Sequence, residues 1–389
     1  MKKYLVTSCV LSLFGVTAHG QSSVTVYGVI DAPLEYVTNL ASAPPTINPA
    51  TGVVTQQPGG DRFSLQSGGG LSGSRWGLRG VEELGGGLQA LFVLENGFGV
   101  DDGRPQQGGR LFGRQAFVGL QNQWGKLTFG RQYTSLFEVM ANFSPTAFAT
   151  LYEPVVAITG LNLRSDNTVK YTGAFGDFLA EAHWSFGTGV GTIGNAVLAG
   201  GGAGEVPGSS RDNTGYGAGI SYIRGPVGMA VAYDQWNPAV TAGNSGTSKK
   251  VAAAASYSWG PAKIMAGYRW ARTTDAASNT LLRDDLYWAG VNYQATANLG
   301  LTLAYYYDDA KTLKTVATQP NINQANPWQV SFISDYNLSK RTDLYLTMAY
   351  SKNSGLNFDT SAISFANGYF LEQGKTSQFG AAVGIRHKF

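Results

Sequence analysis

The chain ends with "QFGAAVGIRHKF", a segment in which apolar side chains alternate with small or charged ones up to the terminal Phe389. A two-residue period of this kind is typical of a β-strand that is apolar on one face. Chain ends usually fray as polar tails. A strand that continues to the last residue needs a partner strand, and this requirement limits the folds that the whole chain can adopt.

The same period recurs along most of the sequence, for example in "FLAEAHWSF" (178–186), "LTLAYYYDD" (301–309) and "DLYLTMAYSK" (343–352). Tyr and Trp gather near the ends of these segments, as in the aromatic girdles of a membrane barrel. The 52 glycines suit turns, and the mean hydropathy of −0.10 is too polar for a bundle of membrane helices. The pattern therefore predicts an all-β membrane protein.

The connections between these segments are of two kinds, tight turns and long polar loops. Seven tight turns alternate with eight long loops, which predicts about sixteen antiparallel strands with both chain ends on the tight-turn side. An even number of strands can close into a barrel, so the final strand is expected to pair with the first, 22–36. The predicted turns are 83–87, 122–126, 175–177, 224–228, 259–263, 295–300 and 338–342.

The N-terminus has the pattern of a secretory signal: Lys2 and Lys3 precede an apolar run, and Gly20 ends a small-residue cleavage motif. We expect a signal peptide at 1–20 and one barrel domain at 21–389; a short buried helix is the alternative. Cys9, the only cysteine, lies in this segment, so no disulfide or zinc–thiolate site is expected. Without the two lysines the formal charge is about +1, which indicates no nucleic-acid partner.

Several longer stretches resemble the general diffusion porins of Gram-negative outer membranes, in the neisserial and beta-proteobacterial branch. They are "SSVTVYGVIDAPLEY" from 22, "GSRWGLRGVEELGGGLQALFVLENGF" from 73, "LFGRQAFVGL" from 111, "GKLTFGRQYT" from 125, "RSDNTVKYTG" from 164, "YNLSKRTDLYL" from 336 and the terminal "VGIRHKF". The resemblance spans the chain from end to end. It implies a homotrimer of sixteen-stranded barrels in the outer membrane, in contact with lipid and lipopolysaccharide.

The resemblance also assigns roles to two parts of the chain. The third long loop, about 133–163, is expected to fold inward and narrow the pore. Phe389 is expected to be the signal that the barrel-insertion machinery reads, although a Phe that only fills the lipid face has the same sequence pattern.

Strand parity predicts which charges face the lumen. Arg75 and Arg79 share one face in "SRWGLRG", opposite Trp76 and Leu78, and the same argument directs Arg164 inward. A charge on the lipid face near the bilayer midplane costs about 2–4 kcal/mol, so the inward orientation is favoured. For Arg114 and Arg131 strict parity gives the apolar face; a bulge, a strand end or a subunit interface would each explain them.

The third loop carries two acids, Glu138 and Glu153. The resemblance places them across the lumen from the arginines, where the resulting field would orient dipolar solutes and set ion preference. Ordinary solvated lumen charges are the alternative. We expect a mild preference for anions.

Catalytic and cofactor chemistry find little support in the sequence. His19 leaves with the signal and His387 is terminal, so His183 remains, and a polar lumen residue beside Glu181 is its simplest interpretation. No cofactor or metal is expected. The sequence predicts a water-filled channel for passive diffusion of ions and small hydrophilic solutes; a substrate-specific channel and a barrel-type enzyme are the alternatives.

Overall fold

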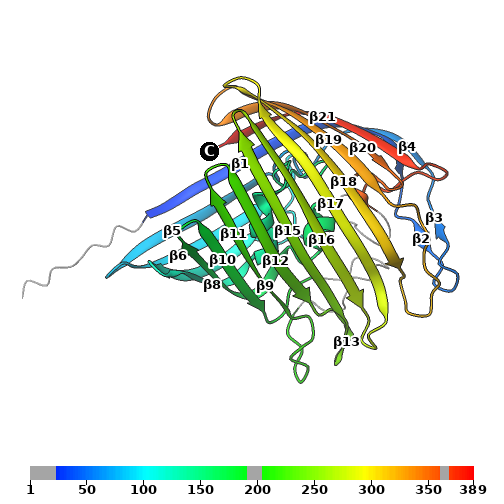
Figure 1. The fold of residues 1–389 in the computed structure, drawn as a ribbon, viewed down its shortest axis with the longest axis horizontal. Coiled ribbons are helices and arrows are strands. Elements are labelled where there is room, and N and C mark those ends of the chain that lie inside the picture. Colours follow the sequence, from blue (N-terminus) through cyan, green and yellow to red (C-terminus); the bar gives the residue numbers. More distant parts are fainter. Residues whose placement is uncertain (1–22, 191–203, 360–367) are drawn as a thin grey trace, which may run out of the picture.

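The computed structural model describes residues 23–190, 204–359 and 368–389, so the predicted signal peptide lies outside the described residues. Oblique antiparallel strands form one closed wall (Figure 1). The predicted all-β barrel is confirmed, with sixteen strand positions around it. These are β1 (Ser23–Ala41), β5 (Arg75–Gly85), β6 (Leu88–Gly97), β7 (Gln115–Asn122), β8 (Gly125–Tyr133), β9 (Arg164–Phe175), β10 (Phe178–Ser185), β11 (Gly215–Arg224), β12 (Val227–Trp236), β15 (Thr247–Trp259), β16 (Ala262–Thr274), β17 (Thr280–Gln294), β18 (Leu299–Leu313), β19 (Trp328–Asn337), β20 (Thr342–Lys352) and β21 (Ser377–Lys388).

All seven predicted tight turns lie at one end of the barrel and join neighbouring strands. The long loops are at the other end, and two of them carry small hairpins. These hairpins are β2 (Thr46–Ile47) with β3 (Val54–Thr55), and β13 (Ala239–Thr241) with β14 (Asn244–Ser245).

The wall closes between β1 and β21, as the sequence predicts. Val29 pairs with Lys388 and Val37 pairs with Gly380. Beyond the last residue of β21, Phe389 exchanges two backbone hydrogen bonds of 3.1 Å with Gly28. A Cβ on Gly28 would lie 2.3 Å from Cζ of Phe389, so the glycine leaves the space that the terminal ring occupies.

Two strands lie end to end beside β1 and together occupy one of the sixteen strand positions of the wall. The sequence analysis does not predict this feature. β5 pairs with the first part of β1, and β4 (Gly59–Leu65) pairs with its last part. The segment 66–74 between them leaves the wall. The backbone amides of Leu71 and Ser72 donate to the carboxylate of Asp31, and the carbonyl of Gly70 accepts from the amide of Leu151 in the third long loop.

The two faces of the strands agree with the predicted parity. Trp184 and Tyr305 are 42% and 43% exposed on the outer face. Glu181, His183 and Tyr306, at the opposite parity, are buried inside the barrel.

The third long loop lies inside the barrel. It contains α1 (Ser135–Ala141), which Thr134 caps by accepting from the amide of Phe137, and α2 (Val155–Thr159). A short 3-10 helix, η1 (Leu356–Phe358), comes from the last long loop. No helix in these described ranges is long and apolar enough to cross a membrane.

The loop packs an apolar core against one side of the lumen, where a water-filled interior was expected. The core forms because small alanines on the inner face of β12 and β15 leave room for the loop's large side chains. Its members include Leu136, Val139, Met140, Phe143 and Ile158 from the loop, and Ala230, Ala232, Ala252, Trp288 and Tyr306 from the wall. One cavity remains between the loop and β5 to β9, and a second remains between the loop and β15 to β19.

Candidate pore constriction

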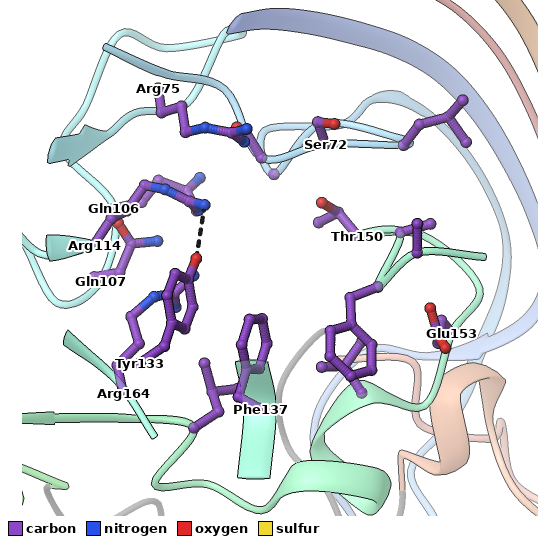
Figure 2. Close-up of a pocket in the computed structure, with 18 of the residues that line it drawn as sticks. Ser72, Arg75, Gln106, Gln107, Arg114, Tyr133, Phe137, Thr150, Glu153 and Arg164 are labelled. Carbon is purple, nitrogen blue, oxygen red and sulfur yellow. Dashed lines mark hydrogen bonds between the residues drawn. The ribbon is translucent and has the colours of Figure 1, made fainter. Parts of the chain in front are cut away.

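Three arginines line a cavity of about 440 Å³ between the barrel wall and the third loop. Arg75 opens β5, Arg114 immediately precedes β7, and Arg164 opens β9. Figure 2 shows them together on one side of the cavity, with Thr150 and Glu153 of the loop across from them. Three of the five predicted wall arginines are therefore brought together.

The intervening strands supply two residues that connect these arginines. Glu95 on β6 accepts from Nε of Arg114 at 2.7 Å and lies 3.6 Å from Nε of Arg75. Tyr133 on β8 accepts from Arg114 at 3.0 Å and from Arg164 at 2.7 Å, and the Arg164 guanidinium lies 4.5 Å from the centre of its ring. Four strands and the residue just before β7 thus contribute one residue each to a continuous row, hereafter the arginine row.

The sequence analysis missed Glu95 and Tyr133. Strand parity could have found Glu95, because it pairs with Gly77, which lies between Arg75 and Arg79 on the lumen face. The row holds three guanidinium groups and one carboxylate, so it keeps an excess of positive charge.

Arg79 faces the lumen as predicted, but it does not line the cavity. It lies four residues closer to the tight turns than Arg75, with its guanidinium 5.4 Å from the centre of the Tyr27 ring. Tyr27 in turn donates to Glu95 at 3.1 Å. Arg79 therefore flanks the row on its tight-turn side.

Arg131 does not line the cavity, and its pairing follows the strict parity: it pairs with Ala116 of β7, two residues along from the exposed pair of Phe129 and Val118. The ladder between β8 and β9 shifts register after Gly130, whose φ of 128° suits glycine, so Arg131 has no partner on β9. Arg131 binds Asp166 at 2.6 Å, and Arg110, another residue that the sequence analysis missed, binds the same carboxylate at 2.8 Å. Arg114 has a simpler explanation, because it precedes the first residue of β7.

The two loop acids occupy bonded positions. Glu138 forms an ion pair with Lys170, which also contacts Glu181 at 3.1 Å, and Glu138 does not line the cavity. Glu153 lines the cavity but is only 1% exposed; it accepts from Ser144 at 2.6 Å and from Tyr306 at 3.2 Å.

Burial raises the pKa of the Glu153 carboxyl, which belongs to the loop and not to a spanning strand. The carboxylate bonded to the arginines is Glu95, from the wall itself. The arginines consequently face neutral residues of the loop, among them Ala147, Phe148, Ala149 and Thr150.

Ser135, His183 and Asp234 form a row that resembles a nucleophile, base and acid. Ser135 Oγ lies 3.0 Å from Nδ1 of His183, and Nε2 of His183 lies 3.7 Å from Asp234. All three residues are buried, and none lines the cavity beside the arginine row. The backbone amide of Ser135 also donates to Nδ1, at 3.2 Å, so this contact fixes the start of α1 against the wall.

Comparison with known proteins agrees with this architecture. A family model described as Gram-negative porin matches residues 7–356. An outer membrane porin protein of Bordetella pertussis is 31% identical, and outer membrane porin protein 32 of Delftia acidovorans is 30% identical, each over the full length of both chains. The solved structure of an anion-selective porin from Comamonas acidovorans superposes with a TM-score of 0.70 and 26% identity, covering 95% of this chain and 100% of that one.

Proposed function

The chain belongs to the Gram-negative porin family and is a β-barrel of the outer membrane, and from this premise we propose that it conducts anions somewhat better than cations. The channel is water-filled and passive, and it passes ions and small hydrophilic solutes. The proposal gives the arginine row, together with Arg79 and Arg131 on its flanks, the role of a basic constriction wall. Glu138 and Glu153 hold the third loop opposite that wall.

The arginine row is the observation that carries the proposal. Arg75, Arg114 and Arg164 line the cavity beside the loop, and the single carboxylate near them, Glu95, contacts only Arg75 and Arg114. The Debye length is about 8 Å at physiological ionic strength, so charges at the narrow section act most strongly on a passing ion. The anion-selective porin from Comamonas acidovorans, as its title describes it, supports the same sign.

Reversal potentials in a KCl gradient test the proposal. We expect the wild-type channel to pass chloride better than potassium, by a ratio that falls toward one as salt rises. Arg75→Ala and Arg164→Ala should shift the ratio toward potassium. Arg341→Ala is the matched control, since it removes an exposed arginine near a tight turn and should change nothing.

A wild-type preference for potassium would overturn this assignment. It would mean that other lumen acids, such as Asp166 and Glu181, dominate the electrostatic field in the pore. Block by one sugar or organic acid at low concentration would favour the substrate-specific alternative. The same recordings can include both solute classes.

The proposal extends to biogenesis and assembly. The signal peptide is 1–20, the mature barrel is 21–389, and Phe389 is read by the barrel-insertion machinery. Three barrels associate through β1, β21 and the segment 111–131. On this last segment Val118 is 56% exposed on the outer face, next to the small residues Ala116 and Gly119.

A further inference from the structure

The outer face of β15, β16 and β17 carries a row of basic residues at the long-loop end of the barrel. Lys249 pairs in register with Arg272, and Arg272 pairs with Arg283, so the three side chains stand on adjacent strands at one height. Lys250 and Arg269, at the opposite parity, are buried inside the barrel, which fixes the row on the outer face. Figure 1 shows these strands side by side.

Two of these cations have no acid partner within the described residues. Arg283 binds Asp285 at 2.9 Å and lies 5.2 Å from the centre of the Trp270 ring. Lys249 and Arg272 are exposed; Arg272 donates to Thr280 Oγ1, and neither of them forms an ion pair. Lys311 of β18 is offset by Asp309.

Like charges directly opposite each other on adjacent strands destabilise a sheet unless something neutralises them. The row of Lys249, Arg272 and Arg283 therefore has the arrangement expected of an anion site. Its height at the long-loop end corresponds to the headgroup region of the outer leaflet.

An apolar groove of about 660 Å³ lies below this row, on the outer face of β15 to β19. Its floor is formed by small residues, since Ala255 pairs with Ala266 and Ala266 pairs with Ala289. Larger outward side chains form its borders: Tyr257, Ile264, Val291, Leu303 and Tyr305.

The spacing between the row and the groove suits one lipid molecule. Lys249 and Ala255 are six residues apart on β15, about 20 Å along the strand. With the usual strand tilt this is about 15 Å along the membrane normal, the depth of one leaflet. Aromatic rings lie between the two, with Tyr268 and Tyr287 5.2 Å apart.

We propose that this face binds a phosphorylated lipid of the outer leaflet, with its phosphate on Lys249 and Arg272 and an acyl chain in the alanine groove. A second copy of the chain is a poorer occupant, because the cations of one barrel would need acids on the other. The inference rests on the proposed function only for the orientation of the barrel in the outer membrane.

Native mass spectrometry of the full-length protein in mild detergent tests the inference, with bisphosphorylated lipid A as the probe. Lys249→Gln with Arg272→Gln should weaken retention of lipid A about tenfold or more, because each cation near an anionic membrane surface contributes about fivefold. Lys340→Gln with Arg341→Gln removes two exposed cations at the opposite end and should leave retention unchanged. Dephosphorylated lipid A should bind the wild type as weakly as bisphosphorylated lipid A binds the Lys249/Arg272 variant.

A second variant tests the acyl chain separately. Ala266→Leu with Ala289→Leu fills the groove from its floor and should also weaken retention, while inorganic phosphate alone should not displace the lipid. Equal retention by wild type and either double variant would overturn the proposal. So would a change in oligomeric state of the Lys249/Arg272 variant, which would indicate contact between copies. Reversal potentials of the same preparations report on the ion pathway independently.

Discussion

Glu95 sets how much of the arginine charge reaches the water in the pore. Its two oxygens divide between Arg75 and Arg114, and the carboxylate also accepts from Tyr27. Arg164 has no share in it and depends on the Tyr133 hydroxyl and ring. One acid compensates one of the three cations. The arginine row therefore keeps a net positive charge, although the chain as a whole is nearly neutral.

Glu95→Gln tests this balance with almost no change in shape. The amide keeps an acceptor for Arg114 but removes the only carboxylate of the arginine row, so we expect the chloride-to-potassium permeability ratio to rise. The rise should be largest at low salt, where screening is weakest. Glu83→Gln, in a tight turn, is the control. A ratio that stays constant or falls in Glu95→Gln would show that the row does not dominate the field.

At this scale, alternation of side chains predicts orientation only inside regular strands. It directs Arg75 and Arg79 correctly to the lumen. It does not predict the bulge at Gly130, next to Arg131, because that bulge depends on pairing with β9 and has no local sequence pattern. Arg114 precedes its strand, and strand boundaries are the least certain part of a sequence-based assignment.

At the scale of elements, the third loop owes its position to burial on one side of the lumen. Leu136, Val139 and Phe143 are fully buried against the alanines of β12 and β15. The ion pair of Lys170 with Glu138 and the contact of His183 with Ser135 fix the start of the same loop. The wall arginines therefore face a surface whose location is set mainly by packing.

Leu136→Ala should loosen this loop without opening the barrel. Truncating a buried Leu costs about 2–5 kcal/mol, and the wall keeps its own hydrogen-bonded ladders. We expect larger or more variable single-channel conductance and a weaker ion preference, measured in planar bilayers. Leu303→Ala, on the outer face and 49% exposed, should behave as wild type. Conductance identical to wild type in Leu136→Ala would mean that the loop does not limit the pore.

Elements differ in how far local sequence predicts them. The seven tight turns and the alternating strands are local features, and the sequence predicts both. The excursion of 66–74 and the packed core inside the lumen depend on contacts between distant segments, such as Asp31 with Leu71 and Phe143 with Trp288. Neither contact has a local signature, so the sequence predicted an infolded third loop but not the apolar core that this loop forms with the wall.

At the scale of the whole molecule, closure answers why the chain ends in a strand. β21 lies between β20 and β1, and the backbone of Phe389 is bonded to Gly28. The ring of Phe389 remains 46% exposed on the outer face, where it is accessible to lipid or to another protein.

Deletion of Phe389 should show whether its ring acts as an insertion signal or only as apolar bulk on the lipid face. It removes the terminal ring and two backbone hydrogen bonds and leaves every charge of the arginine row in place. We expect a lower amount of protein in isolated outer membranes, with an unaltered reversal potential for each channel that inserts. Phe389→Leu keeps an apolar side chain and serves as the comparison. If the deletion variant reaches wild-type abundance, Phe389 acts only as bulk on the lipid face.

In a trimer, one part of the barrel's outer surface contacts the neighbouring barrels and another part contacts lipid. Both parts are apolar. Val118 of β7 belongs to the proposed contact face and Val231 of β12 to the far side of the barrel; they are 56% and 47% exposed. A tryptophan is accommodated in lipid, whereas in a close-packed interface the added volume forces neighbours apart, at a cost of about 1–3 kcal/mol. Val118→Trp should therefore abolish the slow, heat-labile oligomer on unheated detergent gels, and Val231→Trp should preserve it. The reverse result would indicate that the contact between barrels is on the β12 side. Finding only monomer in mild detergent extracts of wild-type membranes would contradict the trimer, and would mean that lipid covers both outer faces.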